Sequence, residues 1–321
     1  MLLPRLIASL FSFGLMVMGM DIAVGQDYPT KPIRLLVSEP GGAGDFAARL
    51  IAPPLALSLG QRLIIDNRPG AFTSGRLAAN ASPDGYTLLF VASNLWLQPF
   101  MRDNVPFDPV KDFSPITLVT TSPLIVVVHP SVPADSVKEL IALAKAKPGA
   151  LNYGSGNTGS SSHLGPELFK SMTGLNIVRV PYKGAGPALN ALVAGEVQLM
   201  IASAGASMPH VKSGRLRALA VTSAQPSALL PGLPAVAASG LTGYEFAQTL
   251  GVLAPARTPA TIINQLNREI ARVIHQADVK QKFLIAGVEP VGSSSMAFAA
   301  LIKSDMIRLG KVIRDAGIHE E

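Results

Sequence analysis

The stretch Pro40-Gly41-Gly42-Ala43-Gly44-Asp45 lies between an apolar run, Ile33 to Val37, and a helix-like run that begins at Phe46. Glycines at positions 41, 42 and 44 can adopt the positive φ angles that turn several backbone N–H groups toward one point. Asp45 is a favourable N-cap, so the following helix would direct its first N–H groups and its positive dipole end to the same place. The stretch predicts an anion-binding loop between a strand and a helix.

A second segment has the same character much later in the chain: Gly154-Ser155-Gly156-Asn157-Thr158-Gly159-Ser160-Ser161. It follows a short strand-like run, Leu151 to Tyr153. Two such loops on opposite sides of one cleft would hold a small carboxylate between them. The alternative is that these glycines form a tight turn that binds nothing.

Composition excludes several classes of protein. The chain has 321 residues, of which 48% are apolar and 15% charged, so it can bury a large core, is not generally disordered and has room for two domains. The net charge of +6 is spread thinly, with no basic run and only one Trp and five Tyr for stacking. Nucleic-acid binding is therefore poorly supported, whereas a mild positive field suits an anionic solute.

The first 25 residues differ from the rest of the chain. Arg5 is followed by an almost wholly apolar run, Leu6 to Met20, and then by small residues at Ala23-Val24-Gly25. This order predicts a cleaved signal peptide over residues 1–25; the alternative is an uncleaved anchor. Because the chain has no cysteine, it has neither a disulfide nor the lipid-bearing cysteine of a lipoprotein. We expect a free periplasmic protein.

From Tyr28 onward, short β-rich runs alternate with amphipathic segments, which predicts an α/β fold. The expected strands are Ile33 to Val37, Leu63 to Asp66, Thr87 to Ala92, Ile125 to His129, Ile177 to Val180, Val197 to Ile201, Leu219 to Thr222 and Gly251 to Ala254. Ser136 and Glu139 have capping-box spacing and open a helix that ends before Pro148-Gly149. Thr258-Pro259 opens another, with one apolar side formed by Ile263, Leu266, Ile270 and Ile274.

Two segments mark where the chain is expected to cross between lobes. Thr121-Ser122-Pro123 precedes an apolar strand in mid-chain, and Thr249-Leu250-Gly251 precedes another one later. Neither is rich enough in Pro, Gly or Ser to be a flexible linker, so we expect a two-segment hinge. The expected division is residues 26–123 for the first part of lobe 1, 124–249 for lobe 2, and 250–321 for the return to lobe 1.

The order and spacing of several short segments resemble the periplasmic solute-binding proteins of tripartite tricarboxylate transporters, the Bug family. The segments are Tyr28-Pro29-Thr30-Lys31-Pro32-Ile33-Arg34, Pro40-Gly41-Gly42 with Asp45 and Arg49, Asp66-Asn67-Arg68-Pro69-Gly70-Ala71, Pro83-Asp84-Gly85-Tyr86-Thr87-Leu88, Phe107-Asp108 with Lys111-Asp112-Phe113, Leu151-Asn152-Tyr153-Gly154-Ser155 with His163-Leu164, Val180-Pro181-Tyr182-Lys183-Gly184, and Ala254-Pro255 with Thr258-Pro259. The resemblance implies a two-lobed periplasmic binding protein of type II, a Venus flytrap with a parallel or mixed sheet in each lobe.

The same resemblance implies which residues bind the ligand carboxylate, through backbone N–H groups, hydroxyls and ordered water. In lobe 1 these are Gly41, Gly42, Ala43, Gly44 and Asp45, and in lobe 2 they are Ser155, Thr158, Gly159, Ser160 and Ser161. Ser93, Asn94 and Ser203 each follow a predicted strand, where ligands of open α/β sheets collect, and are weaker candidates.

Three positions depart from the family pattern. Glu39 replaces a proline or small residue before the glycines; it would pair with an ammonium group of a mixed-charge ligand such as an amino acid, or else point to solvent. Thr249 stands where a Trp is common, which removes a bulky side chain from the cleft or hinge. Pro53-Pro54 should kink the first helix or make it restart near Ala52.

Other chemistries find little support. Gly154-x-Gly156-x-x-Gly159 matches a dinucleotide fingerprint, but the next strand, Ile177 to Val180, carries no ribose-binding carboxylate. The chain contains no Gly-x-Ser-x-Gly and no metal-ligand spacing. His163 is either a hydrogen-bonding group in the cleft or a helix-start residue. Tyr182 to Gly186 either flanks the cleft or forms a simple strand-to-helix turn.

The sequence therefore predicts a monomeric, exported solute-binding protein without cofactor or covalent chemistry. It would capture a small carboxylate by lobe closure and deliver it to inner-membrane transporter subunits. One alternative is a sensor that presents its closed form to a periplasmic signalling partner. The other is an enzyme on the same scaffold.

Overall fold

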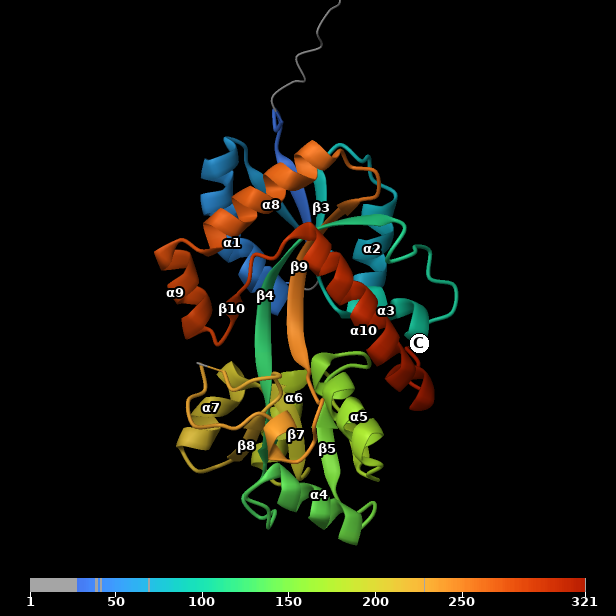
Figure 1. The fold of residues 1–321 in the computed structure, drawn as a ribbon, viewed down its shortest axis with the longest axis vertical. Helices are drawn as coiled ribbons and strands as arrows, with labels where there is room; N and C mark the ends of the chain where they lie inside the picture. The colour runs from blue at the N-terminus through green and yellow to red at the C-terminus, as the bar shows by residue number, and fades with distance from the viewer. Residues whose placement is uncertain (1–27, 38–39, 41, 69, 228, 321) are drawn as a thin grey trace, which may run out of the picture.

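The computed structural model describes residues 28–320 apart from 38–39, 41, 69 and 228, and it has two lobes (Figure 1). The expected signal peptide, residues 1–25, lies outside the described residues, as do Glu39 and Gly41. Within the described part of the chain, no helix is both long enough and apolar enough to cross a membrane. The fold is α/β with two lobes, as the sequence predicted.

Lobe 1, the upper lobe in Figure 1, contains a mixed sheet of order β2-β1-β3-β9-β4, with β10 paired to β4. β1 pairs in parallel with β2 and β3, whereas β9 is antiparallel to both β3 and β4. The strands are β1 (Ile33–Val37), β2 (Leu63–Asn67), β3 (Thr87–Ala92), β4 (Phe113–Val128), β9 (Ala247–Pro255) and β10 (Glu289–Pro290). The parallel pairing places the carboxyl ends of β1 and β3 side by side.

Lobe 2 contains a second mixed sheet, in which the far half of β4 lies between β7 and β8. The parallel strands β5 and β6 extend this sheet beyond β7. The remaining strands are β5 (Asn152–Ser155), β6 (Val178–Pro181), β7 (Leu199–Ser203) and β8 (Arg217–Val221). β4 thus belongs to both sheets.

Helices cover both faces of each sheet. In lobe 1, α1, α8 and α9 pack on one face and α2, α3 and α10 on the other; in lobe 2, α6 and α7 lie opposite α4 and α5. The helices are α1 (Ala43–Leu59), α2 (Ala71–Ala79), α3 (Asn94–Met101), α4 (Val137–Ala146), α5 (Ser161–Thr173), α6 (Ala185–Val193), α7 (Ala204–Lys212), α8 (Ala260–Ile274), α9 (Ala277–Ile285) and α10 (Ser295–Asp315). One buried apolar cluster includes residues of α3, α10 and α5, so it joins the lobes.

The two strongest helix predictions are confirmed. α4 begins after Ser136, whose hydroxyl accepts the backbone N–H of Glu139 at 3.2 Å, as capping-box spacing requires. α8 begins directly after Thr258-Pro259, and its apolar stripe is buried against the sheet of lobe 1. Local sequence is decisive in both helices because the residues at their starts and their apolar periodicity predict the same segments.

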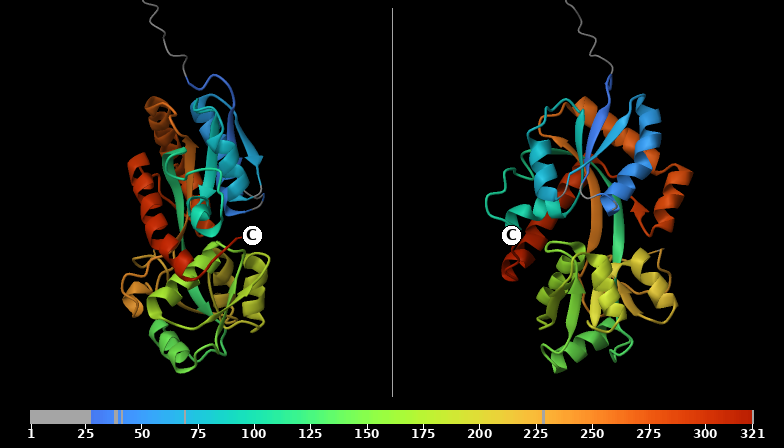
Figure 2. Two further views of the ribbon diagram at one scale, coloured as in Figure 1. Left: turned by 90° about the vertical axis from the view of Figure 1, so that its right-hand side faces the viewer. Right: turned by 180° about the vertical axis from the view of Figure 1, so that it is seen from behind.

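β4 is much longer than expected. The sequence predicted a strand from Ile125 to His129, but β4 starts at Phe113 and includes Pro123. Pro123 pairs with the first residue of β9, and the lobe 2 partners of β4 begin at the next residue, Leu124, so its missing N–H disrupts the ladder little. Both strands that run between the lobes, β4 and β9, are visible from behind in Figure 2.

α1 contains Pro53 and Pro54 but continues from Ala43 to Leu59, so the restart expected near Ala52 is wrong. Residues on both sides of the prolines, including Ile51 and Leu55, are buried in the core that α1 shares with α8 and β1. Packing along the whole helix offsets the lost backbone hydrogen bonds.

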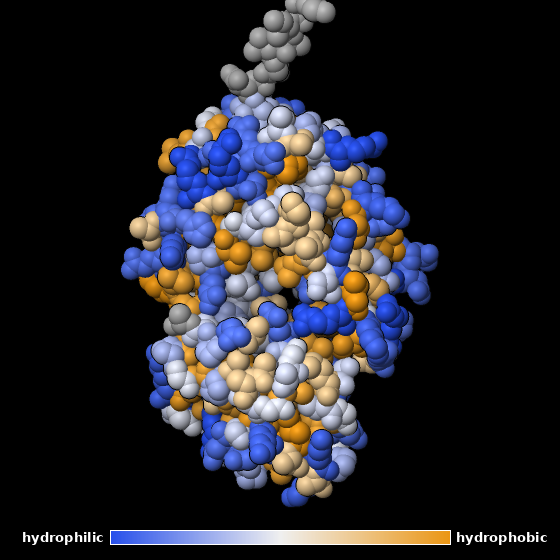
Figure 3. Space-filling view, in the orientation of Figure 1, coloured by the Kyte–Doolittle hydropathy of each residue, from blue (hydrophilic) through white to orange (hydrophobic). Residues whose placement is uncertain are grey.

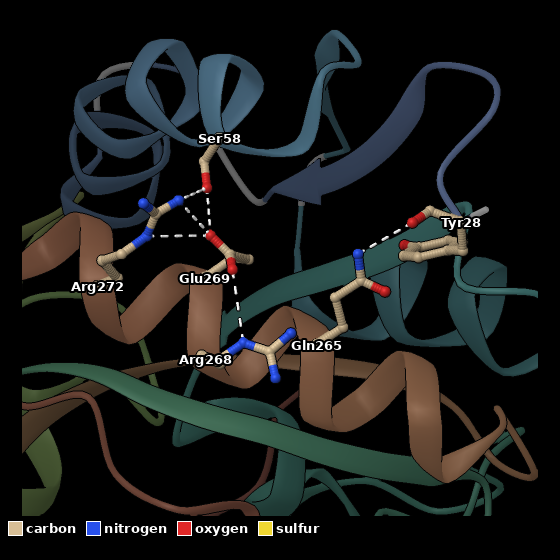
Figure 4. A network of polar contacts seen from close by, with 6 residues as sticks. All are labelled: Tyr28, Ser58, Gln265, Arg268, Glu269 and Arg272. Carbon is tan, nitrogen blue, oxygen red and sulfur yellow. Dashed lines mark hydrogen bonds and ion pairs between the residues drawn. The ribbon is translucent and has the colours of Figure 1, made fainter.

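Polar side chains of α8 also bind two other segments of lobe 1, the end of α1 and Tyr28 (Figure 4). The carboxylate of Glu269 accepts hydrogen bonds from Ser58 at the end of α1 and from Arg272, and these bonds lower its pKa. The amide of Gln265 donates to the backbone oxygen of Tyr28 at 2.9 Å. These contacts fix Tyr28 and the end of α1 against one helix.

Candidate functional site

The N-cap and the first residue of α1 are exposed at the boundary between the lobes. The N-cap is Gly42, which has no side chain to bind the first N–H groups of the helix. The carbonyl oxygen of Gly42 accepts a hydrogen bond from the N–H of Phe46 at 2.9 Å. Gly42 and Ala43 are both exposed. The first N–H groups of an α-helix have no partner within the helix, and they lie at its positive dipole end. The start of α1 can therefore bind an anion.

The expected positive φ angles are wrong at two of the three glycines. Gly42 has φ −77° and ψ 172°, which is extended backbone, and Gly44 lies inside α1. Gly41 lies outside the described residues. The helix begins earlier than the sequence suggested, so its own first turn, and not a left-handed nest at Gly42 and Gly44, supplies the donors.

Asp45 is not the N-cap. It is the third residue of α1 and is 5% exposed. Its carboxylate accepts hydrogen bonds from Arg49 Nε at 2.9 and 3.0 Å and from Asn67 Nδ2 at 2.9 Å. Because Asn67 ends β2, Asp45 ties the start of α1 to the neighbouring strand, and its charge favours the helix dipole.

A cleft of about 360 Å³ opens where the start of α1 faces the two strands between the lobes. Its residues come from both lobes: Gly42, Ala43, Phe46 and Ala47 of α1, Ser122 of β4, Gln248 and Leu250 of β9, Ser203 and Gly205 at the start of α7, and Ala286, Gly287 and Val288 before β10. The surface is hollowed at this level of the molecule (Figure 3). The starts of α1 and α7 thus share one cleft.

The loop between β5 and α5 holds the second set of predicted residues. Ser155 is fully buried; its hydroxyl donates to the carbonyl oxygen of Gly156 at 3.2 Å and accepts from Arg179 Nε at 2.8 Å. Gly159 has φ 73° and lies against Met101 of lobe 1: a Cβ there would be 2.7 Å from the sulfur. The loop therefore touches lobe 1 but does not line the cleft described above.

The other loop residues are more accessible. Thr158, Ser160 and Ser161 are partly exposed, and Ser160 is the N-cap of α5. The Ser160 hydroxyl lies 3.2 Å from that of Ser162, whose oxygen also accepts the N–H of Gly156 at 2.9 Å. Ligand contact by Ser155, Thr158, Gly159, Ser160 and Ser161 stays a prediction.

The three weaker candidates all lie at strand ends. Ser93 and Asn94 form the N-cap and first residue of α3, directly after β3. Ser203 ends β7, is the N-cap of α7, and pairs with Leu124 of β4. Of the three, Ser203 lines the cleft with α1.

Sequence reasoning missed Ser122 and Gln248. They are paired across β4 and β9, so both side chains lie on the same face of the ribbon and reach the cleft. A signal existed, because each lies in or next to a segment expected to form the hinge. What the sequence could not give is the register that places them opposite each other.

His163 has the helix-start role. Its Nδ1 accepts the N–H of Gly159 at 3.2 Å, which holds the loop against the first turn of α5. The side chain is 3% exposed. Burial lowers the pKa of His163 to about 3, and the positive charges of Arg179 and Lys170 act in the same direction. The imidazole is therefore neutral and able to accept this hydrogen bond at pH 7.

The low pKa of His163 predicts a loss of stability in mild acid. An unfolded histidine has a pKa near 6.5, so below that pH the unfolded chain takes up a proton that the folded chain does not, and stability falls from about pH 6.5 toward pH 3. At pH 5 this amounts to about 2 kcal/mol. Urea unfolding at pH 7 and pH 5 should show the drop, and His163→Asn should remove about that much of it.

The exposed His319 provides the control for this comparison. His319→Asn should keep the full difference in unfolding free energy between pH 7 and pH 5. An unchanged difference in His163→Asn would show that this imidazole is not held neutral by the fold.

Metal chemistry has no candidate site in the described part of the chain, where no group of three or more His, Asp or Glu residues is arranged to hold an ion. The polar groups available in the cleft are backbone N–H donors, the hydroxyls of Ser122 and Ser203, and the amide of Gln248. Such a set can bind and orient a small polar anion.

The comparisons with known proteins agree on one family. Residues 47–318 match the model of the "Tripartite tricarboxylate transporter family receptor". Protein BugT of Bordetella pertussis is 35% identical over 305 residues, which cover 93% of this chain and 94% of BugT. A protein of Pseudomonas sp. strain P51, described as a UPF0065 protein in the tcbD-tcbE intergenic region, is 36% identical over 294 residues, which cover 89% of this chain and 86% of that protein.

Solved structures give the same result. Rpa4515 of R. palustris, determined with adipate, is 36% identical with a TM-score of 0.78, covering 91% of this chain and 99% of its own. MatC from Rhodopseudomonas palustris with bound malate is 27% identical with a TM-score of 0.74, covering 89% of this chain and 100% of its own. The periplasmic binding protein BugD is also 27% identical, with a TM-score of 0.74 over 92% of this chain and 100% of its own. The chain therefore belongs to the tripartite tricarboxylate transporter receptor family, the Bug-type periplasmic solute-binding proteins.

Proposed function

We propose that this protein captures a small carboxylate-bearing metabolite between its lobes and delivers it to a tripartite tricarboxylate-type transporter in the inner membrane. The observation that carries the proposal is the shared cleft, where the start of α1 from lobe 1 and the start of α7 from lobe 2 meet over Ser122 and Gln248. Two helix N-termini favour a negative charge, and the hinge side chains supply hydrogen bonds to the rest of the ligand.

The relatives support a carboxylate as the ligand class. Rpa4515 was determined with adipate and MatC with malate, and both align with nearly all of this chain. The cleft volume of about 360 Å³ lies in the range of small-ligand sites. The loop from Ser155 to Ser161 would complete the site when the lobes close, since Gly159 already lies against lobe 1.

The hinge would be the ribbon of β4 and β9. The residues at which the chain was expected to change lobes, 123–124 and 249–250, lie within these two strands. Bending there keeps the strand pairing and changes the distance between the starts of α1 and α7. The closed form would then be the form that the transporter recognises.

Thermal unfolding with a panel of acids tests the ligand class. Purified protein is heated alone and with adipate, malate, citrate or glutamate, with adipamide as the uncharged control. An acid present at about 100 times its Kd should stabilise the fold by about 2.7 kcal/mol, which raises the Tm by several degrees, whereas adipamide should not. No shift with any of the acids contradicts the proposal.

Delivery to a transporter needs a separate experiment in cells. Deletion of the gene should abolish uptake of the radiolabelled acid that gives the largest thermal shift, and the gene supplied in trans should restore it. Intact uptake together with lost induction of genes by the same acid would favour the sensor alternative.

A further inference from the structure

Arg179 of β6 lies beneath the loop from Ser155 to Ser161. Arg179 pairs with Tyr153 in the parallel β5–β6 ladder, two residues before the loop begins on the neighbouring strand. Its Nε donates to the buried Ser155 hydroxyl at 2.8 Å, and its terminal nitrogen donates to the carbonyl oxygen of Gly156 at 3.2 Å. One guanidinium therefore fixes both the hydroxyl and the backbone at the point where the strand turns into the loop.

The charge of Arg179 has no acidic partner among the described residues. Five arginines in this part of the chain are partly buried, and four of them form ion pairs with carboxylates. The pairs are Arg34 with Asp66, Arg102 with Glu320, Arg217 with Asp135 and Arg308 with Asp305. Arg179 is the exception, because its hydrogen bonds go to a hydroxyl and a carbonyl.

Removing a charge from water without a counter-ion costs free energy. Such unpaired charges are found mainly at functional sites, where they interact with a ligand or substrate. The field of Arg179 reaches the start of α5, since it helps to lower the pKa of His163 there. It therefore adds to the positive dipole end of that helix, next to the partly exposed Thr158, Ser160 and Ser161.

We infer that Arg179 is the residue that makes lobe 2 selective for an anion. It holds Ser155 and Gly156 in position, and the carboxylate of the captured ligand is its missing counter-charge. The inference rests on the proposed function, because it requires that the loop from Ser155 to Ser161 closes on an acid. Selectivity for the charge of the ligand would then come from the Arg179 side chain under the loop. Selectivity for the shape of the ligand would come from the backbone of the loop.

Isothermal titration with adipate, malate, citrate and glutamate tests this role in four variants. Arg179→Met removes both charge and hydrogen bonds, Arg179→Gln keeps a donor without the charge, and Arg179→Lys keeps the charge. Arg217→Met is the matched control: Arg217 also lies on a lobe 2 strand and binds backbone oxygens, those of Val132 and Ala134 at 3.1 and 3.2 Å.

The expected Kd of the bound acid rises roughly 10- to 100-fold in Arg179→Met and Arg179→Gln, because a charge-assisted interaction is lost. Arg179→Lys should retain more affinity than Arg179→Gln, and Arg217→Met should bind as the wild type does. The dependence of Kd on salt concentration should also weaken in Arg179→Gln, a change that a purely structural role does not produce.

Failure of the inference and failure of the proposed function differ in outcome. If the wild-type protein binds none of the four acids, the proposed function is overturned and the inference with it. If the wild type binds but Arg179→Gln binds equally well, or better than Arg179→Lys, the inference is overturned and the proposed function stands. Should Arg179→Met not fold, the comparison of Arg179→Gln with Arg179→Lys decides alone.

Discussion

Gly42→Phe should weaken carboxylate binding at least about 100-fold, a loss of roughly 2.8 kcal/mol, while the protein stays folded. Gly42 is exposed and lines the cleft, so the ring would occupy the space in front of the first turn of α1. Its φ of −77° and ψ of 172° are open to any residue, so the backbone has no reason to resist the change. Calorimetric titration with the acid that gives the largest thermal shift measures the loss.

Two further variants separate blocking of the cleft from general damage. Gly42→Ala adds a single methyl group and should cost much less than the phenylalanine. Thr261→Phe places the same ring on the exposed first turn of α8, outside the cleft, and should leave affinity unchanged. If Gly42→Phe binds as tightly as Thr261→Phe, the start of α1 is not part of the site.

Gly251→Val should destabilise the fold by about 3 kcal/mol or more. Gly251 lies in β9 beneath α10, and a Cβ there would lie 2.5 Å from Phe298 Cε1. Phe298 is fully buried and packs edge-on against Trp96, with ring centroids 5.9 Å apart, so it has little room to move. Urea unfolding of the two proteins, followed by circular dichroism, measures the difference.

The close approach of Gly251 and Phe298 also predicts non-additivity. Phe298→Ala alone should cost about 3–5 kcal/mol because it leaves a cavity. In the double variant the valine occupies part of that cavity, so the total loss should be smaller than the sum of the single losses. Gly186→Val is the control for the close contact at Gly251. It introduces the same side chain at a position where a Cβ meets no atom within 4 Å. Additive losses would mean that α10 shifts freely over β9.

Much of the fold follows from local sequence. β1 and β3 begin and end at the residues predicted for them, because each is a short, mostly apolar run between turn residues. The first half of β4 was not predicted, since Pro115 and Pro123 are normally strand breakers. Both are tolerated because of pairing with β9, a segment far away in the sequence, and no local pattern reports such a partner.

The site was predictable only in part, for the same reason. The start of α1 and Ser203 were found from glycines and strand ends, and they do share a cleft. The predicted cap at Asp45 failed because α1 begins two residues earlier, at Ala43, and because the Asp45 carboxylate is held by Asn67 of β2, whose position is set by tertiary structure. Arg179 gave no signal in the sequence, since its proposed role depends on its forming no ion pair with a carboxylate in the described fold.

The position of β9 between β3 and β4 favours an order of folding in which lobe 2 forms first. Lobe 2 is built from one uninterrupted stretch, from the end of β4 to the start of β9, and can complete its core as soon as that stretch is available. The sheet of lobe 1 is incomplete until β9 has paired, because β9 lies between β3 and β4. Once lobe 2 has folded, it brings β9 alongside β4 and shortens the loop that has to be closed before the sheet of lobe 1 is complete.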